Sequence, residues 1–212
     1  MDFSWEPQPS ANTAINDLWA LIERDGPLVD EDDLAADLVL SDWSERAHSQ
    51  ADRRRTFIAF YSWAVPSQDA ITEIRKFVGE RQLLEVCAGA GLWAKLLANE
   101  GVEITAADPI PAHKPHFPVE ELEAEAAVRA HRECDALLLV WPPFRDDCAL
   151  RALRAFNGNR VVLVGDPQFC ADRQFHAVLK REWALRESHP VPSWPGLDDA
   201  AYFYVRRVAR PG

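Results

Sequence analysis

The sequence predicts an α/β protein with a Rossmann-like, doubly wound, mainly parallel sheet and an N-terminal helical extension. From residue 83 onward, short apolar runs alternate with amphipathic helical stretches, which is typical of a parallel sheet covered by helices. The first of these runs ends in a turn of small residues that opens directly into a helical pattern. The chain closes with two strand-like segments joined by a Pro-rich loop. Together these features predict about seven strands, with the C-terminal strand antiparallel.

Residues 1–80 are expected to form the helical extension, because they show helical patterns and no ligand-binding motif. One helix is predicted from Asn12 or Thr13, as the cap, to Asp25, where Gly-Pro follows. Another is expected at 44–64, and Ser67 is expected to cap a further helix that runs to Val78.

Residues 81–212 are expected to form the α/β domain. The expected strands are 83–87, 102–107, 118–122, 135–140 and 160–165, and the expected helices are 92–100, 124–132, 146–156 and 172–181. The last two strands, 183–189 and 201–208, fit an antiparallel edge because the second is rich in aromatic and β-branched residues.

The turn after the first strand has the features of a ligand-binding loop. Gly89 and Gly91 have no side chains, so a ligand can approach the backbone closely. The free N–H groups at the start of the next helix suit an anion or another hydrogen-bond acceptor. Asp108 ends the second apolar run at 108 − 91 = 17 positions after Gly91, about the separation at which nucleotide-binding folds place an acid on a ribose. The segment therefore predicts a site for a nucleoside-type cofactor.

A dinucleotide site fits this turn poorly. The fingerprint G-x-G-x-x-G requires a third glycine, which is missing here, and the bulky Trp93 lies where close packing would be needed. Glu85, two residues before the turn, is also unusual for a dinucleotide-binding strand.

The turn instead resembles motif I of the class I S-adenosylmethionine (SAM)-dependent methyltransferases, written E/D-x-G-x-G-x-G. Glu85 stands at the acidic position, Gly89 and Gly91 at the second and third glycines, and Cys87 replaces the first glycine. Asp108 matches the acid that binds the ribose hydroxyls in that family. The resemblance covers roughly residues 60–208 and implies SAM as the cofactor. The implied cofactor-binding residues are Glu85, Cys87, Ala88, Gly89, Gly91, Trp93, Asp108, Pro109 and Tyr61.

Two of these aromatic residues have an alternative role. Trp93 either lines the cofactor pocket or packs below it. The aromatic segment 60–67, which contains Tyr61 and Trp63, either covers the cofactor as a lid or joins the helical extension to the sheet.

A second motif follows the apolar run 135–140, which two prolines stop because they remove hydrogen-bond donors and fix φ. Trp141, Pro142, Pro143 and Phe144 are similar to motif IV of amino-methyltransferases, N/D/S-P-P-Y/F. Trp141 has no acceptor side chain, so methylation of an adenine amine is not implied. We interpret the four residues as a candidate slot for an aromatic acceptor; the alternative is a proline stop that merely ends a core strand.

Composition restricts the partners. Of 212 residues, 23 are Lys or Arg and 34 are Asp or Glu, and the net charge of −11 disfavours a broad phosphate-binding surface.

The four cysteines are scattered along the chain, and no export signal is recognised. Together these features predict reduced thiols and a cytoplasmic location. The six histidines show no metal-ligand spacing, and no stretch is long enough to span a membrane.

The expected function is transfer of a methyl group from SAM to a small aromatic or heteroatom acceptor. Two alternatives stay open. One is a SAM-binding sensor or partner-binding protein without methyl transfer, which Trp141 favours. The other is a nucleic-acid base methyltransferase, suggested by the Pro-Pro-Phe turn and opposed by the net charge.

Overall fold

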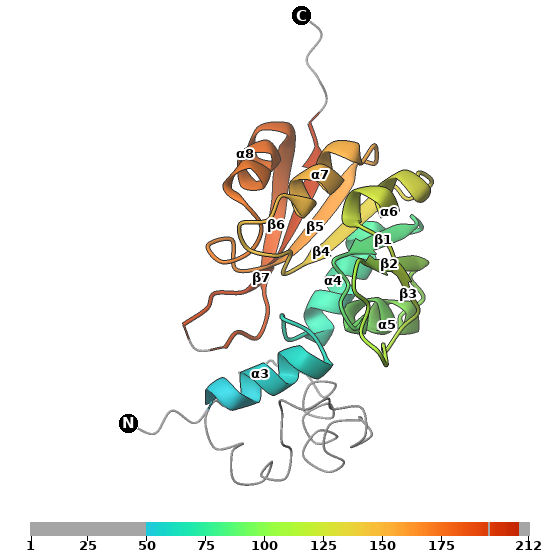
Figure 1. Cartoon of the computed structure of the whole chain (residues 1–212). Helices are drawn as coiled ribbons and strands as arrows, with labels where there is room; N and C mark the ends of the chain where they lie inside the picture. Colours follow the sequence, from blue (N-terminus) through green and yellow to red (C-terminus); the bar gives the residue numbers. More distant parts are fainter. Residues whose placement is uncertain (1–49, 195, 208–212) are drawn as a thin grey trace, which may run out of the picture.

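The computed structural model describes residues 50–194 and 196–207 (Figure 1). Seven strands form one sheet in the order β3-β2-β1-β4-β5-β7-β6. The strands are β1 (Leu83–Val86), β2 (Ile104–Asp108), β3 (Val119–Glu121), β4 (Ala136–Val140), β5 (Arg160–Gly165), β6 (Trp183–Pro190) and β7 (Ala200–Arg206). Neighbouring strands are parallel except at β7, which is antiparallel to both β5 and β6. The predicted fold class is confirmed.

Helices cover both faces of this sheet. They are α3 (Gln50–Phe60), α4 (Gln68–Val78), α5 (Leu92–Asn99), α6 (Ala124–Ala130), α7 (Cys148–Ala155) and α8 (Arg173–Glu182). The crossovers β1–α5–β2 and β4–α7–β5 run in opposite directions along the sheet, so right-handed connections place α5 and α7 on opposite faces. Helices α6, α7 and α8 contact one another in turn, as do α4 and α5 (Figure 1).

The helices before the sheet follow the sequence in part. Ser67 caps α4, and its side chain accepts a hydrogen bond from the N–H of Ala70 at 3.1 Å, as expected. Helix α3 ends at Phe60 instead of the predicted residue 64. The N–H groups of Tyr61 and Ser62 both donate to the carbonyl of Phe57, and the chain turns away from the helix there. The predicted helix at 12–25 and the predicted start of α3 at 44 lie outside the described residues.

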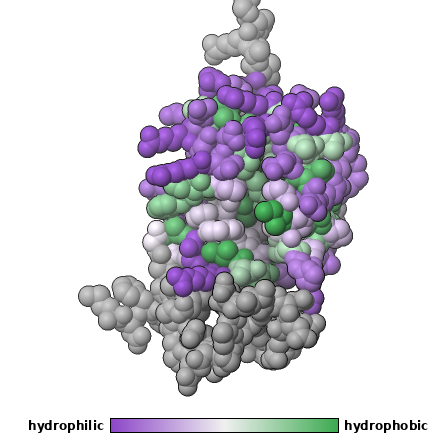
Figure 2. All heavy atoms as spheres, viewed as in Figure 1, coloured by the Kyte–Doolittle hydropathy of each residue, from purple (hydrophilic) through white to green (hydrophobic). Residues whose placement is uncertain are grey.

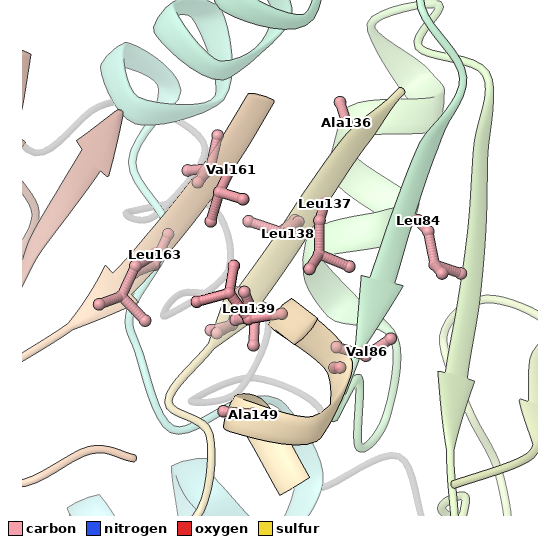
Figure 3. Packing of buried hydrophobic residues seen from close by; sticks show 14 of the residues in the cluster. Leu84, Val86, Ala136, Leu137, Leu138, Leu139, Ala149, Val161 and Leu163 are labelled. Carbon is pink, nitrogen blue, oxygen red and sulfur yellow. The ribbon is translucent and has the colours of Figure 1, made fainter. Parts of the chain in front are cut away.

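The core forms around the central strands. Every residue of β1 and β4 is buried, which explains their almost continuous apolar sequences. Figure 3 shows side chains of β1, β4 and β5 packed together with Ala149 of α7. Since β1, β2, β4 and β5 are parallel, their carboxyl ends meet at one edge of the sheet. Within the described residues, no helix is both long and apolar enough to cross a membrane.

Candidate functional site

Backbone strain gathers at the carboxyl edge of the sheet. In residues 50–194 and 196–207, four non-glycine residues have positive φ: Cys87 (58°), Trp141 (48°), Arg145 (61°) and Ala171 (57°). Cys87 follows β1, Trp141 and Arg145 follow β4, and Ala171 follows β5. Such conformations cost free energy and persist where the surrounding structure imposes them, often at functional sites. The strain therefore marks this edge as the candidate site.

The loop between β1 and α5 brings bare backbone to this edge. Gly89 has φ 55°, and a Cβ atom added there would meet nothing within 4 Å. Gly91 has φ 70° and is the N-cap of α5. A Cβ atom on Gly91 would lie 3.0 Å from Cγ2 of Val119 and 3.1 Å from Cβ of Phe117. Gly91 is thus required for packing, whereas Gly89 faces open space that a ligand can fill.

Asp108 at the end of β2 is hydrogen bonded to this loop. One carboxylate oxygen accepts a hydrogen bond from the N–H of Gly89 at 2.9 Å, and the other accepts one from the N–H of Ile110 at 2.9 Å. The N–H of Ala88 donates to the carbonyl of Ala107 at 3.1 Å, and the adjoining Pro109 is exposed. These contacts brace the loop and leave lone pairs on the carboxylate for a ligand hydroxyl.

Glu85 lies on β1 directly behind the loop and is only 1% exposed. Burial raises its pKa from the ordinary 4.5 to about 8; a hydrogen bond from the N–H of Ala94 opposes the rise, and the negative charge of Asp108 adds to it. Its Oε2 atom has no hydrogen-bond partner in the described part of the chain. A buried carboxylate oxygen without a partner is costly, so a cationic or hydrogen-donating ligand group would satisfy it.

Two predicted aromatic residues lie in the core. Trp93 is buried, and its Nε1 donates to the carbonyl of Ala64 at 3.3 Å. This contact favours the packing alternative for Trp93. Tyr61 is buried too and stacks on the ring of His116. The backbone N–H of His116 donates to the carbonyl of Ala90 in the β1–α5 loop at 2.8 Å. Tyr61 therefore supports the β1–α5 loop through His116.

Cys87 occupies the position of the first motif I glycine. Its Sγ lies 3.8 Å from Sγ of Cys148 at the start of α7, and both thiols are free. The contact with Cys148 and burial raise the pKa of Cys87, so the thiol stays protonated. The larger side chain is thus accommodated by pointing toward α7. In the described residues, no group of three or more His, Cys, Asp or Glu side chains is placed to hold a metal ion.

The turn after β4 has a buried and an exposed end. Trp141 is buried, and its Nε1 donates to Oδ1 of Asp199 at 2.9 Å. Pro142 is also buried, whereas Pro143 is exposed and Phe144 is 52% exposed, with the Arg145 guanidinium 5.0 Å from its ring centroid. Phe144 is therefore not a core residue, so its ring is available to a ligand.

Three further residues join the site. Sequence reasoning placed Trp63 in a segment that could cover the cofactor, but it did not select Asp199 or Arg54 as site residues. Asp199 precedes β7 and reaches Trp141 only because β7 returns antiparallel beside β5. Trp63 stacks on Trp141 at a centroid distance of 5.7 Å, and the Arg54 guanidinium lies 5.6 Å from the Trp63 centroid. These contacts span the chain from α3 to β7, and no local sequence pattern signals them.

Exposed apolar side chains gather at the same edge. The large exposed hydrophobic residues of the described chain are Trp63, Ile110, Phe144, Phe169 and Leu185. All except Leu185 lie in loops at the carboxyl edge. In Figure 2, hydrophobic residues interrupt the hydrophilic surface in the middle of the view, whereas the coloured residues at the upper end are mostly hydrophilic. An apolar surface of this kind suits a flat, hydrophobic ligand.

Solved structures of similar fold include several methyltransferases. The N-methyltransferase NodS from Bradyrhizobium japonicum, in complex with S-adenosylhomocysteine (SAH), has 12% identity and a TM-score of 0.49, covering 66% of this chain and 86% of its own. A TehB-like SAM-dependent methyltransferase from Corynebacterium glutamicum has 16% identity and a TM-score of 0.47, covering 74% and 96%. Magnesium protoporphyrin IX methyltransferase from Synechocystis, with bound SAH, has 9% identity and a TM-score of 0.44, covering 66% and 83%.

No protein-family model and no curated protein sequence matches this chain. All three identities lie at 16% or lower and all three TM-scores lie below 0.5, so these structures do not establish the function of this chain.

Proposed function

We propose that this protein binds SAM at the β1–α5 loop and directs its methyl group to a small, flat acceptor. The observation that carries the proposal is the combination of Gly89, which faces open space, with Asp108, which is hydrogen bonded to the same glycine. Nucleoside cofactors bind at a glycine-containing loop with an acidic side chain from the next strand beside it.

The residues at the loop fit the chemical groups of SAM. Asp108 would accept hydrogen bonds from the ribose hydroxyls, as the resemblance to motif I implies. The buried Oε2 of Glu85 offers a partner to the ammonium group. Helix α5 starts after Gly91 without a side-chain cap, so the N–H groups of Leu92 and Trp93 could receive the carboxylate, while that of Ala94 donates to Glu85.

SAM supplies an electrophilic methyl group on a sulfonium. The protein would contribute position and alignment, which can account for much of the acceleration of such a transfer. The exposed ring of Phe144 and the other apolar residues of the carboxyl edge would hold a flat acceptor. The net charge of −11 opposes a nucleic acid as the acceptor.

Replacing Gly89 with Ala tests the proposed cofactor site. The new Cβ would meet no protein atom within 4 Å, but it would occupy the space assigned to SAM. Binding should therefore weaken about 5- to 150-fold, the range of a 1–3 kcal/mol overpacking cost. Gly101→Ala is the matched control, because Gly101 also has positive φ and open space around its Cβ position. Isothermal titration calorimetry with SAM should show a loss only for Gly89→Ala; an equal effect of both substitutions would contradict the site.

A SAM-binding sensor without methyl transfer is the second candidate function. Trp141 favours it, because its side chain cannot accept a hydrogen bond from a substrate amine.

Replacing Phe144 with Ala tests whether this ring forms part of a slot for the methyl acceptor. Since Phe144 is half exposed, its loss should change stability by only about 0.5 kcal/mol and leave SAM affinity unchanged. Turnover of a methyl acceptor should fall through kcat/KM.

Leu185→Ala is the control for Phe144→Ala, because Leu185 is exposed to the same degree on β6. Thermal melts with and without SAM come first. A large drop in Tm for Phe144→Ala, unlike Leu185→Ala, would show a packing role and exclude the slot.

A further inference from the structure

The indole of Trp141 is fixed on three sides. Its Nε1 donates to Oδ1 of Asp199 at 2.9 Å, and the ring of Trp63 stacks on it with an interplanar angle of 21°. Gly165 packs against it, since a Cβ atom there would lie 3.1 Å from Cδ1 of Trp141. The indole is therefore held at the carboxyl ends of β4 and β5, where β7 begins.

Asp199 is an unusual residue at this position. It is 1% exposed, and its backbone N–H donates to Oγ of Ser193 at 2.7 Å. While Oδ1 accepts from Trp141, the buried Oδ2 has no hydrogen-bond partner among the described residues. Burial raises the pKa of Asp199 to about 7, and the negative charge of Asp166 adds to the rise. The hydrogen bond from Trp141 and the positive charge of Arg54 lower the pKa and so oppose it.

Arg54 provides an unsatisfied donor on the same ring pair. Its guanidinium carbon lies 5.6 Å from the Trp63 centroid and 5.9 Å from the Trp141 centroid. Its Nε is buried, and the described part of the structure offers it no acceptor. An acceptor atom and a donor atom, both buried and both unpaired, thus flank one pair of stacked indoles. A buried polar atom without a partner destabilises the folded protein unless a bound group forms a hydrogen bond with it.

We propose that Asp199 and Arg54 form the recognition site for a flat, neutral ring that carries an N–H group next to a carbonyl, as in a lactam. The N–H donates to Oδ2 of Asp199, and the carbonyl accepts from Arg54. Asp199 thereby supplies the hydrogen-bond acceptor that Trp141 lacks. The proposal rests on the proposed function, because it defines the acceptor site of the same protein.

The charges of the two residues select this chemistry. A cationic ligand would be repelled by Arg54, and an anionic ligand by Asp199, whereas a neutral donor–acceptor edge satisfies both. The Trp63 ring is 48% exposed and lies in the irregular segment between α3 and α4. The ligand ring takes the place of the Trp63 indole against Trp141, so Trp63 is the side chain that must move.

A matched pair of probes tests the site on the wild-type protein. 2-Quinolone has the lactam N–H and carbonyl, and N-methyl-2-quinolone has the same ring and carbonyl with a methyl group in place of the N–H hydrogen. Ligand-observed NMR titration should show 2-quinolone binding at least about tenfold more tightly, the scale of one hydrogen bond to a charged group. Equal affinities, or no binding of either probe, would overturn the proposal.

Asp199→Asn should remove the preference for 2-quinolone, because an amide presents N–H groups where the carboxylate accepted a bond. Asp198→Asn, at the exposed neighbouring residue, should keep the preference. A preference that survives Asp199→Asn in a protein that melts normally would also overturn the assignment. SAH titration of the same wild-type sample separates the two proposals: SAH binding without N–H discrimination refutes only the acceptor site, and discrimination without SAH binding refutes only the cofactor site.

Discussion

The protein is expected to lose up to about 5 kcal/mol of unfolding free energy as the pH rises from 4.5 to 8, because Glu85 must ionise inside the core. The pKa of Glu85 is higher in the folded protein, at about 8, than its ordinary value of 4.5. Below pH 4.5 the carboxyl is protonated in both states and costs nothing. Above pH 4.5, Glu85 ionises in the unfolded chain but stays protonated in the folded protein. The free energy of unfolding therefore falls until Glu85 also ionises in the folded protein near pH 8. The difference of 8 − 4.5 = 3.5 pH units, at about 1.36 kcal/mol each, sets the magnitude.

Glu85→Gln isolates this contribution, because glutamine keeps the shape and does not titrate. Urea unfolding of both proteins from pH 4.5 to 9 should show the variant gaining stability over the wild type with rising pH. Glu103→Gln, at an exposed residue beside the start of β2, controls for the general effect of charge removal. A difference that stays constant across this range would refute the buried, unpaired state of Glu85.

Asp108→Ala is expected to weaken SAM binding by about 1.5–3 kcal/mol, the scale for a hydrogen bond to a charged group. The substitution removes the carboxylate assigned to the ribose and releases the N–H of Gly89 that it holds. Calorimetry should show this loss for Asp108→Ala and none for Glu103→Ala, which removes an exposed carboxylate near the opposite end of β2. If Asp108→Ala bound SAM with unchanged affinity, Asp108 would not be the residue that binds the ribose.

The fold was predictable because its signals are local. The apolar run of β4, the cap at Ser67 and the glycines of the β1–α5 loop each reflect contacts between near neighbours in the sequence. The mainly parallel sheet follows from the alternation of strands and helices along the chain. The position of Asp108 close to the β1–α5 loop was also predictable, since adjacent parallel strands end at the same edge, but its hydrogen bond to the N–H of Gly89 was not.

The second half of the site was not predictable in this way. The bond between Trp141 and Asp199 joins residues 58 positions apart, and it exists because β7 returns antiparallel beside β5. The sequence shows that Trp141 lacks an acceptor, but not that its indole N–H is paired with a buried acid. In the sequence, Arg54 belongs to a run of three arginines that is typical of a solvated helix face. Only the structure shows that its guanidinium lies near the rings of Trp63 and Trp141.

Calorimetric titration of the wild-type protein with SAH, repeated in the presence of excess NAD or ATP, tests the central proposal most directly. A loop with Gly89 facing open space and Asp108 braced beside it should bind SAH, and neither nucleotide should compete. Tight binding of NAD with no binding of SAH would contradict the assignment of this site to SAM.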